Sequence, residues 1–203
     1  MIPKPNDTEL WLKLLNGENA ALDKIYKLHF QSLFQYGMRM LHDEDEVRDC
    51  LHNLFVKIWE NRKNLNQTDH IRYYLISALR NIISNHRIKE NRYERVEATD
   101  ETVFDLKFSI ESEYIKKEEI NEKTIQLAKA MNQLTSRQKE IIYLKYFEEL
   151  DYNQIADILD LTIKGAYKLS ARAHDALREI MQVDKGLLLL LLLELKKFQF
   201  LIK

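Results

Sequence analysis

The sequence predicts an all-α protein made of two small helical domains joined by an acidic, flexible linker. Its 203 residues suffice for two small domains. Both prolines, Pro3 and Pro5, precede residue 6, so the strongest helix breaker is absent from the rest of the chain. With 45% hydrophobic and 31% charged residues, the composition is that of a globular chain. We place the first domain at residues 6–95, the linker at 96–121, the second domain at 122–183 and a leucine-rich C-terminal tail at 184–203.

Four helices are expected in the first domain. A short one begins at Asp7 or Thr8 and ends at Asn16 and Gly17, and a longer one covers residues 20–41. Asp43 with Glu46 gives the third helix a start like a capping box, and a polar loop at 61–69 precedes the fourth. Apolar residues at three- and four-residue intervals mark the sides expected to face the core: Leu10, Trp11, Leu14 and Leu15; Leu22, Ile25, Tyr26, His29, Leu33, Tyr36 and Met40; Val47, Cys50, Leu51, Leu54, Phe55, Ile58 and Trp59; and Ile71, Tyr74, Leu75, Ala78, Leu79, Ile82 and Ile83.

The local charge reverses sign between the two domains. Residues 71–95 hold six basic and two acidic side chains, a net charge of +4, whereas residues 96–121 hold three basic and eight acidic ones, a net charge of −5. The basic stretch is a candidate surface for nucleic acid, which the overall net charge of -1 conceals. The acidic stretch has no regular period and few apolar residues, among them Phe104, so we expect a solvated, mobile tether.

The second domain has the spacing of a helix-turn-helix. The helical period returns at Ile125, and Thr135 with Gln138 and Asp151 with Gln154 mark two capped helix starts. A turn at residues 160–162 leads to a last helix that Thr162 can cap. The N-terminal end of the second helix in such a motif enters the major groove of DNA. On that helix we expect Ala166, Leu169, Ala173, Ala176 and Leu177 to face inward, and Lys164, Tyr167, Lys168, Ser170, Arg172 and His174 to face solvent or DNA.

Both halves resemble the extracytoplasmic-function group of sigma-70 family RNA polymerase sigma factors. Residues 47–59 (VRDCLHNLFVKIW) are similar to the region 2 helix that docks on the polymerase clamp, and residues 74–81 (YLISALRN) to the promoter-melting helix. Residues 134–137 and 152–159, with Arg172, Ala173 and Leu177, are similar to region 4. The resemblance runs from about residue 20 to residue 181, in the family's order. This chain carries His52 and Asn53 where the family commonly has Gln and an acidic residue, and Asp160 where its turn often has Gly.

The resemblance implies a sigma factor that binds core RNA polymerase, through the clamp of the beta-prime subunit, and directs transcription initiation at specific promoters. The first domain would be the region 2 helical bundle, which binds polymerase and captures the minus-ten element with the loop at 61–69 and the helix after it. The second would be the region 4 helix-turn-helix, which reads the minus-thirty-five element. Promoter DNA and polymerase are therefore expected partners, and an anti-sigma factor is a further candidate partner.

The expected site residues follow from these roles. Arginines can neutralise phosphates, tyrosines can stack on bases, and asparagine can bond a base edge. The residues expected at the polymerase are Asp49, His52, Asn53 and Val56; those at the minus-ten element are Arg72, Tyr73, Arg80, Asn81 and Arg87; and those at the minus-thirty-five element are Thr162, Lys164, Gly165, Tyr167, Lys168 and Arg172.

No catalytic residue, metal site or cofactor is predicted. The acidic run at residues 43–46 beside His42 radiates around a helix start, where acids favour the helix dipole, and Cys50 and His52 point to different sides of their helix. Cys50 is expected to be a buried structural thiol. A single cysteine and no recognisable secretion signal favour a cytoplasmic protein.

Two questions stay open at the level of sequence. A helix-turn-helix regulator that binds operator DNA without polymerase is the alternative function, with the first domain as a dimerisation or sensing module. The run Leu187–Leu193 is too short for a membrane-spanning helix, which needs about 20 apolar residues, so no membrane insertion is expected. We expect it to form a helix that packs on the second domain, on a regulator or on another copy of the chain.

Overall fold

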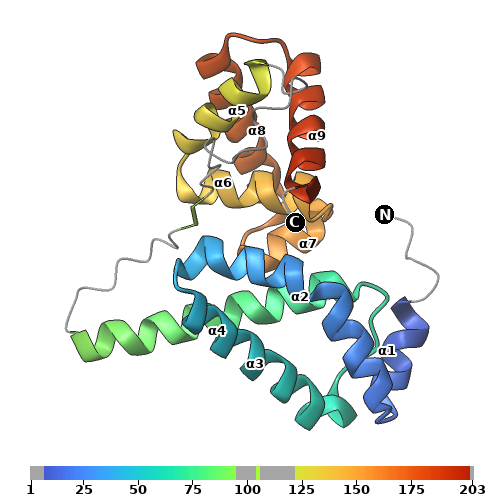
Figure 1. The fold of residues 1–203 in the computed structure, drawn as a ribbon. Helices are drawn as coiled ribbons and strands as arrows, with labels where there is room; N and C mark the ends of the chain where they lie inside the picture. The colour runs from blue at the N-terminus through green and yellow to red at the C-terminus, as the bar shows by residue number, and fades with distance from the viewer. Residues whose placement is uncertain (1–6, 95–103, 106–121, 202–203) are drawn as a thin grey trace. The chain divides into compact units, whose positions relative to one another are not determined.

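The computed structural model describes residues 7–94, 104–105 and 122–201, and Figure 1 shows their arrangement. These residues form helices and turns and contain no strand, which confirms the all-α prediction. The chain divides into two compact units, Met1–Val103 and Phe104–Lys203. Among the described residues, no helix combines the length and the apolar character that crossing a membrane requires.

Unit 1 is a bundle of four helices: α1 (Asp7–Leu15), α2 (Asn19–Leu41), α3 (Glu44–Asn61) and α4 (Ile71–Glu94), with a short 3₁₀ helix η1 (Arg62–Asn64) after α3. Figure 1 shows α2, α3 and α4 gathered together with α1 at one end, and each of these three helices packs on the other two. The Asp43 carboxylate accepts a hydrogen bond from the Glu46 amide at 3.0 Å and so caps α3.

The core of unit 1 follows the apolar period of its helices. Trp11, Tyr36, Val47 and Ile71 are fully buried, and Cys50 is buried as predicted. Gly37 lies where α2 meets the first turns of α3, and a Cβ atom added to it would stand 2.8 Å from Cγ1 of Val47. The two helices therefore approach so closely that a side chain at position 37 would require Val47 or the helix backbone to shift.

Unit 2 contains α5 (Glu122–Asn132), α6 (Ser136–Ile142), a π-helical turn η3 (Tyr143–Phe147), α7 (Tyr152–Ile158), α8 (Ile163–Met181) and α9 (Lys185–Leu201). Both predicted capping boxes are present: the Thr135 hydroxyl with Gln138 at the start of α6, and the Asp151 carboxylate with Gln154 at the start of α7. The Asp151 cap fixes where α7, the first helix of the helix-turn-helix, begins.

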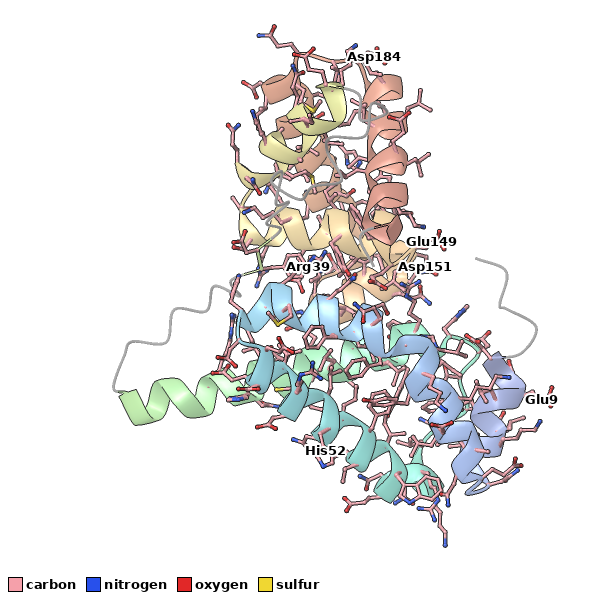
Figure 2. All side chains as sticks on the ribbon, in the orientation of Figure 1. Glu9, Arg39, His52, Glu149, Asp151 and Asp184 are labelled. Carbon is pink, nitrogen blue, oxygen red and sulfur yellow. The ribbon has the colours of Figure 1, made fainter. Side chains whose placement is uncertain are left out.

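The leucine-rich tail forms α9, which packs on α5, α8 and η3 and runs alongside α8 in Figure 1. One side of α9 is buried, and Leu190 and Leu193 on the other side are 62% and 50% exposed. The Lys196 ammonium bonds the Glu149 carboxylate, which Figure 2 shows beside α9. The tail is thus part of unit 2. The buried residues are Leu188, Leu191, Leu192 and Leu195.

Two residues of the acidic segment, Phe104 and Asp105, are held by unit 2. Phe104 is 1% exposed, and its ring centroid lies 5.5 Å from that of Tyr143. The Asp105 carboxylate lies 3.2 Å from the Lys139 ammonium. The prediction that the segment is solvated is therefore wrong at Phe104, because tertiary contacts with an aromatic side chain outweigh the polar composition around it. Apart from Phe104 and Asp105, the residues of the predicted linker at 96–121 lie outside the described residues.

Candidate nucleic-acid and partner-binding surfaces

The helix-turn-helix of unit 2 is built by α7, a tight turn and α8. Asp160 in the turn has φ 52°, the left-handed conformation that Gly adopts most easily. The Thr162 hydroxyl then caps α8 by accepting a hydrogen bond from the Gly165 amide at 3.0 Å. A Cβ atom at Gly165 would lie 3.1 Å from this hydroxyl oxygen. Thr162 and Gly165, both predicted DNA contacts, thus also shape the start of α8.

The exposed side of α8 carries cations at regular spacing. Lys164, Lys168 and Arg172 are all exposed, and each lies four residues from the next, which is about one helical turn of 5.4 Å. Tyr167, on the same part of the helix, is 55% exposed. The structure therefore places these four predicted DNA contacts together on the exposed side of α8. Cations there can contact phosphates, and the tyrosine can reach the edges of bases.

Tyr167 is oriented by its neighbours. The ring of Tyr152 lies 4.1 Å from that of Tyr167, and the hydroxyl of Tyr152 lies 2.9 Å from the Ser170 hydroxyl. The Lys145 ammonium sits 4.8 Å from the centroid of the Tyr152 ring, a cation–π contact. Tyr152 was expected in the α7 match only, and the pairing of two aromatic rings across the turn is not visible in either helix's period.

Two residues predicted to face solvent or DNA are instead inside unit 2. Ser170 is 2% exposed, and His174 is half-buried, with Nε2 at 2.6 Å from the Tyr146 hydroxyl and Nδ1 at 2.6 Å from the Ser170 carbonyl oxygen. Burial lowers the pKa of His174 and raises the pKa of Tyr146 to about 12. The inward side of α8 follows Ala166, Ser170, Ala173 and Leu177, and hydrogen bonds allow the polar members to be there.

The predicted minus-ten residues lie along α4 in different settings. Tyr73, Arg80 and Arg87 are seven residues apart and share one side of the helix, and Asn81 is exposed beside them. The Arg87 guanidinium donates to the Met40 carbonyl oxygen at the end of α2. Arg72 is half-buried. The structure therefore aligns three of the five, and it gives Arg87 a contact within the bundle.

The loop before α4 is fastened by α1. The indole Nε1 of Trp11, a fully buried residue, donates to the Asn66 carbonyl oxygen at 2.9 Å. The Trp11 ring also meets the Tyr74 ring edge-on at 4.9 Å, which supports the expectation that Tyr74 packs in the core. Sequence reasoning gave Trp11 a core role only, because its polar contact is 55 residues away.

The predicted polymerase-binding residues form one exposed stripe on α3. Asp49, His52, Asn53 and Val56 are all exposed, at the spacing of a single helix side, and Figure 2 shows His52 projecting outward. His52 and Val56 also line an open groove of about 430 Å³ between α2 and α3. Aromatic rings form much of its other wall.

Those rings come from α2 and were not predicted as site residues. Tyr26 is 41% exposed, which corrects its assignment to the core, and its ring lies 5.0 Å from those of Phe30 and Phe55. Tyr26 and Phe30 follow Leu22 at intervals of four, a second stripe beside the core stripe. A residue on the border between the two stripes can face either way, so periodicity alone misplaced it. Among the described residues, no group of three His, Cys, Asp or Glu side chains is placed to hold a metal ion.

Comparison with known proteins agrees with this geometry. The region 2 model of the sigma-70 family matches residues 25–93, and its region 4 model matches residues 124–177. Among curated proteins, the RNA polymerase sigma factor YlaC of Bacillus subtilis (strain 168) is 21% identical over 165 residues, which cover 79% of this chain and 90% of that protein. The RNA polymerase sigma-H factor of Pseudomonas aeruginosa is 21% identical over 189 residues, 90% of this chain and 97% of that protein.

Solved structures show the same fold. The sigma factor RpoE of Bartonella quintana, in complex with the anti-sigma factor NepR, has a TM-score of 0.55 at 18% identity, covering 80% of this chain and 98% of that chain. CnrH, in complex with the cytosolic domain of CnrY, has a TM-score of 0.56 at 17% identity, covering 88% of this chain and 99% of that one. The two family models together match more than half of the chain, in order. The chain therefore belongs to the sigma-70 family of RNA polymerase sigma factors.

Proposed function

We propose that this protein binds core RNA polymerase and directs transcription initiation at specific promoters, as a sigma factor without catalytic activity of its own. The observation that carries the proposal is that one chain holds both a region 2 bundle and a region 4 helix-turn-helix. A cytoplasmic location is part of the proposal, because a sigma factor works where polymerase and DNA are.

The stripe on α3 is the proposed polymerase surface. Asp49, His52, Asn53 and Val56 are exposed together, and the apolar groove beside them is walled by Tyr26 and Phe30. An exposed aromatic groove with a polar rim is typical of a protein-binding surface. We place the clamp helices of the beta-prime subunit there. In this polar rim, His52 and Asn53 stand where the family commonly has Gln and an acidic residue.

The minus-ten element is proposed to meet α4 and the loop before it. Arg80 and Tyr73 share one side of α4 with Arg87, and Asn81 is exposed beside them. Cations can hold the backbone of the non-template strand while an aromatic ring stacks on an unpaired base. Trp11 contacts both the loop, at the Asn66 carbonyl oxygen, and α4, at the Tyr74 ring, so that the loop and helix can act on the same strand.

The minus-thirty-five element is proposed to receive the N-terminal end of α8 in its major groove. Lys164, Lys168 and Arg172 would contact phosphates, which position the helix, and Tyr167 would reach the bases. The tilted contact between the Tyr152 and Tyr167 rings, 4.1 Å between centroids, restricts the orientation of the Tyr167 side chain. Thr162 and Gly165 bring the helix start close to the DNA backbone.

An anti-sigma factor is the further proposed partner. The Bartonella quintana relative was solved with the anti-sigma factor NepR. In this chain, the exposed groove between α2 and α3 offers such a protein the surface that we assign to the polymerase clamp. Binding there would keep the protein away from polymerase by direct competition.

The proposal is tested by run-off transcription with purified core polymerase. Expected is a discrete promoter-dependent transcript that needs this protein, and a gel shift on promoter duplex that is weak alone and strong with polymerase. Val56→Glu, a charge placed in the groove rim, should abolish both polymerase binding and the transcript. Lys24→Ala, an exposed change on the far side of α2, is the matched control and should leave both intact.

Tight and specific duplex binding without polymerase, together with no pull-down of core enzyme, would reverse this conclusion. That result would support the alternative function, a helix-turn-helix regulator that binds operator DNA without polymerase, against which the family matches speak.

A further inference from the structure

The exposed side of α8 carries a second stripe of side chains beside its cations. Ile163, Tyr167 and Ala171 are all exposed, and each lies immediately before one of the three exposed cations. Consecutive residues of a helix are about 100° apart around its axis, so the two stripes run side by side along α8. We call Ile163, Tyr167 and Ala171 the apolar ridge.

The ridge begins with an isoleucine that unit 2 does not bury. Ile163 is the first residue of α8, directly after the cap at Thr162, and it is 50% exposed. In a helix-turn-helix this end of the second helix enters the major groove. Among the described residues of α8, the other exposed isoleucine is Ile180, which lies in the last turn. Bound DNA would therefore cover Ile163, and covering its apolar surface is favourable.

The chemistry of the ridge matches one particular group in the major groove. Base pairs present hydrogen-bond donors and acceptors there, together with a single kind of apolar group, the C5 methyl of thymine. The side chains of Ile163 and Ala171 have neither donor nor acceptor, so this methyl is the group that they can recognise. The neighbouring cations suit the phosphates at the side of the groove. The two stripes thus fit the base edges and the backbone of the same duplex.

We propose that the apolar ridge recognises thymine methyl groups in the minus-thirty-five element, with Ile163 as a specificity-determining residue. The inference rests on the proposed function, since it names the base chemistry that this element must offer. Ile163 and Ala171 were not among the DNA contacts expected from the sequence. Ile163 and Tyr167 are about 6 Å apart along the helix axis, and base pairs rise by about 3.4 Å, so the methyl groups that they contact belong to neighbouring base pairs.

The test replaces thymine by deoxyuridine, which pairs identically with adenine and lacks only the C5 methyl. The promoter is one on which this protein and core polymerase give a run-off transcript. Each thymine of its minus-thirty-five element, on either strand, is replaced in turn, and the affinity of the holoenzyme is measured by competition gel shift. Burial of one methyl group is worth about fourfold in affinity. We expect a loss of about fourfold at one or two neighbouring thymines and no loss at the others.

Variants of α8 assign this loss to the ridge. In Ile163→Ala, thymine and deoxyuridine should bind equally at the affected position, because the partner of the methyl group is gone. Ile180→Ala, which truncates an isoleucine that is 39% exposed at the other end of the helix, is the matched control and should keep the full preference for thymine. Lys164→Ala should weaken binding to both DNAs by the same factor, because a phosphate contact carries no base information.

The outcomes separate the inference from the proposed function. With a normal promoter-dependent transcript, the inference would be overturned by equal binding of all the deoxyuridine promoters, or by a thymine preference that persists in Ile163→Ala. The proposed function would stand in either case. A protein that gives no polymerase-dependent transcript on any promoter would overturn the proposed function, and this inference with it, before any thymine is replaced.

Discussion

The close contact between Gly37 and Val47 predicts that Gly37→Ala destabilises unit 1 when residue 47 is Val and stabilises it when Val47 has been replaced by Ala. In Gly37→Ala the new methyl carbon would stand 2.8 Å from Cγ1 and 3.4 Å from Cγ2 of Val47. Carbon atoms prefer about 3.5–4.0 Å, and overpacking of this kind costs about 1–3 kcal/mol. Alanine offsets part of this cost because it favours a helix over glycine by about 1 kcal/mol. We therefore expect unit 1 to lose up to about 2 kcal/mol of its free energy of unfolding.

The second background is Val47→Ala, which removes both methyl groups that block position 37. Val47 is fully buried, so this change alone should cost about 2–3 kcal/mol. In that background Gly37→Ala should stabilise unit 1 by about 1–2 kcal/mol, because the helix preference remains and the new methyl fills part of the cavity.

Tryptophan fluorescence provides the assay, because both tryptophans of the chain, Trp11 and Trp59, lie in unit 1. Urea titrations of the four proteins give the free energies of unfolding, and a loss of 1 kcal/mol corresponds to a melting point lower by about 4–8 °C. If Gly37→Ala stabilised both backgrounds equally, α2 and α3 would not approach as closely as described, and the packing argument would fail.

Four further outcomes are expected. Replacing Lys164 and Lys168 with Ala should make the negative slope of log affinity for promoter DNA against log salt concentration shallower by about 2. An Arg178→Ala, Lys185→Ala double variant, which loses the same charge, should keep the original slope. An unchanged slope in the Lys164, Lys168 variant would mean that the two lysines do not contact phosphate. Trp11→Phe, which cannot bond Asn66, should reduce permanganate reactivity of the melted minus-ten strand while holoenzyme assembly stays normal; unchanged reactivity would separate the loop's position from melting. Asp160→Gly should raise the stability of unit 2 by about 0.5–1 kcal/mol, because glycine adopts φ 52° without strain, whereas a loss would place an unrecognised contact on Asp160. The fold lowers the pKa of His174, so the neutral imidazole contributes stability above the unfolded pKa of about 6.5, and this stability is lost as the pH falls from that value toward the lower folded pKa. Thermal melts followed by circular dichroism should therefore show a falling melting temperature of unit 2 between about pH 7.5 and pH 5.5. His174→Gln should make the melting temperature depend less on pH in this range.

Local signals account for most of what the sequence predicted correctly. The caps at Thr135, Asp151 and Thr162 each join a side chain to an amide a few residues away, so three or four positions of sequence contain the whole interaction. The apolar periods of the helices are equally local, and they placed Val47 and Cys50 in the core. The exposed positions of Lys164 and Lys168 followed from the same period.

The missed features all depend on contacts between residues distant in the chain. Phe104 is buried because Tyr143, 39 positions later, provides an aromatic surface. Tyr26 faces a groove because Phe55 of α3 stands across from it. The period of a single helix contains no information about such partners, and a polar or acidic neighbourhood in sequence misleads when the packing is decided elsewhere.

The buried polar groups behind α8 show why these distant contacts matter for DNA reading. An interface of apolar side chains alone would tolerate small rotations of α8 about its axis, because apolar contacts have little directional preference. The hydrogen bonds of Ser170 to Tyr152 and of His174 to Tyr146 are directional, and they come from two different elements, α7 and η3. They fix the rotation of α8, and rotation decides which side chains face outward. The same bonds that hid Ser170 and His174 from solvent therefore hold the lysine stripe toward the place where DNA is proposed to bind.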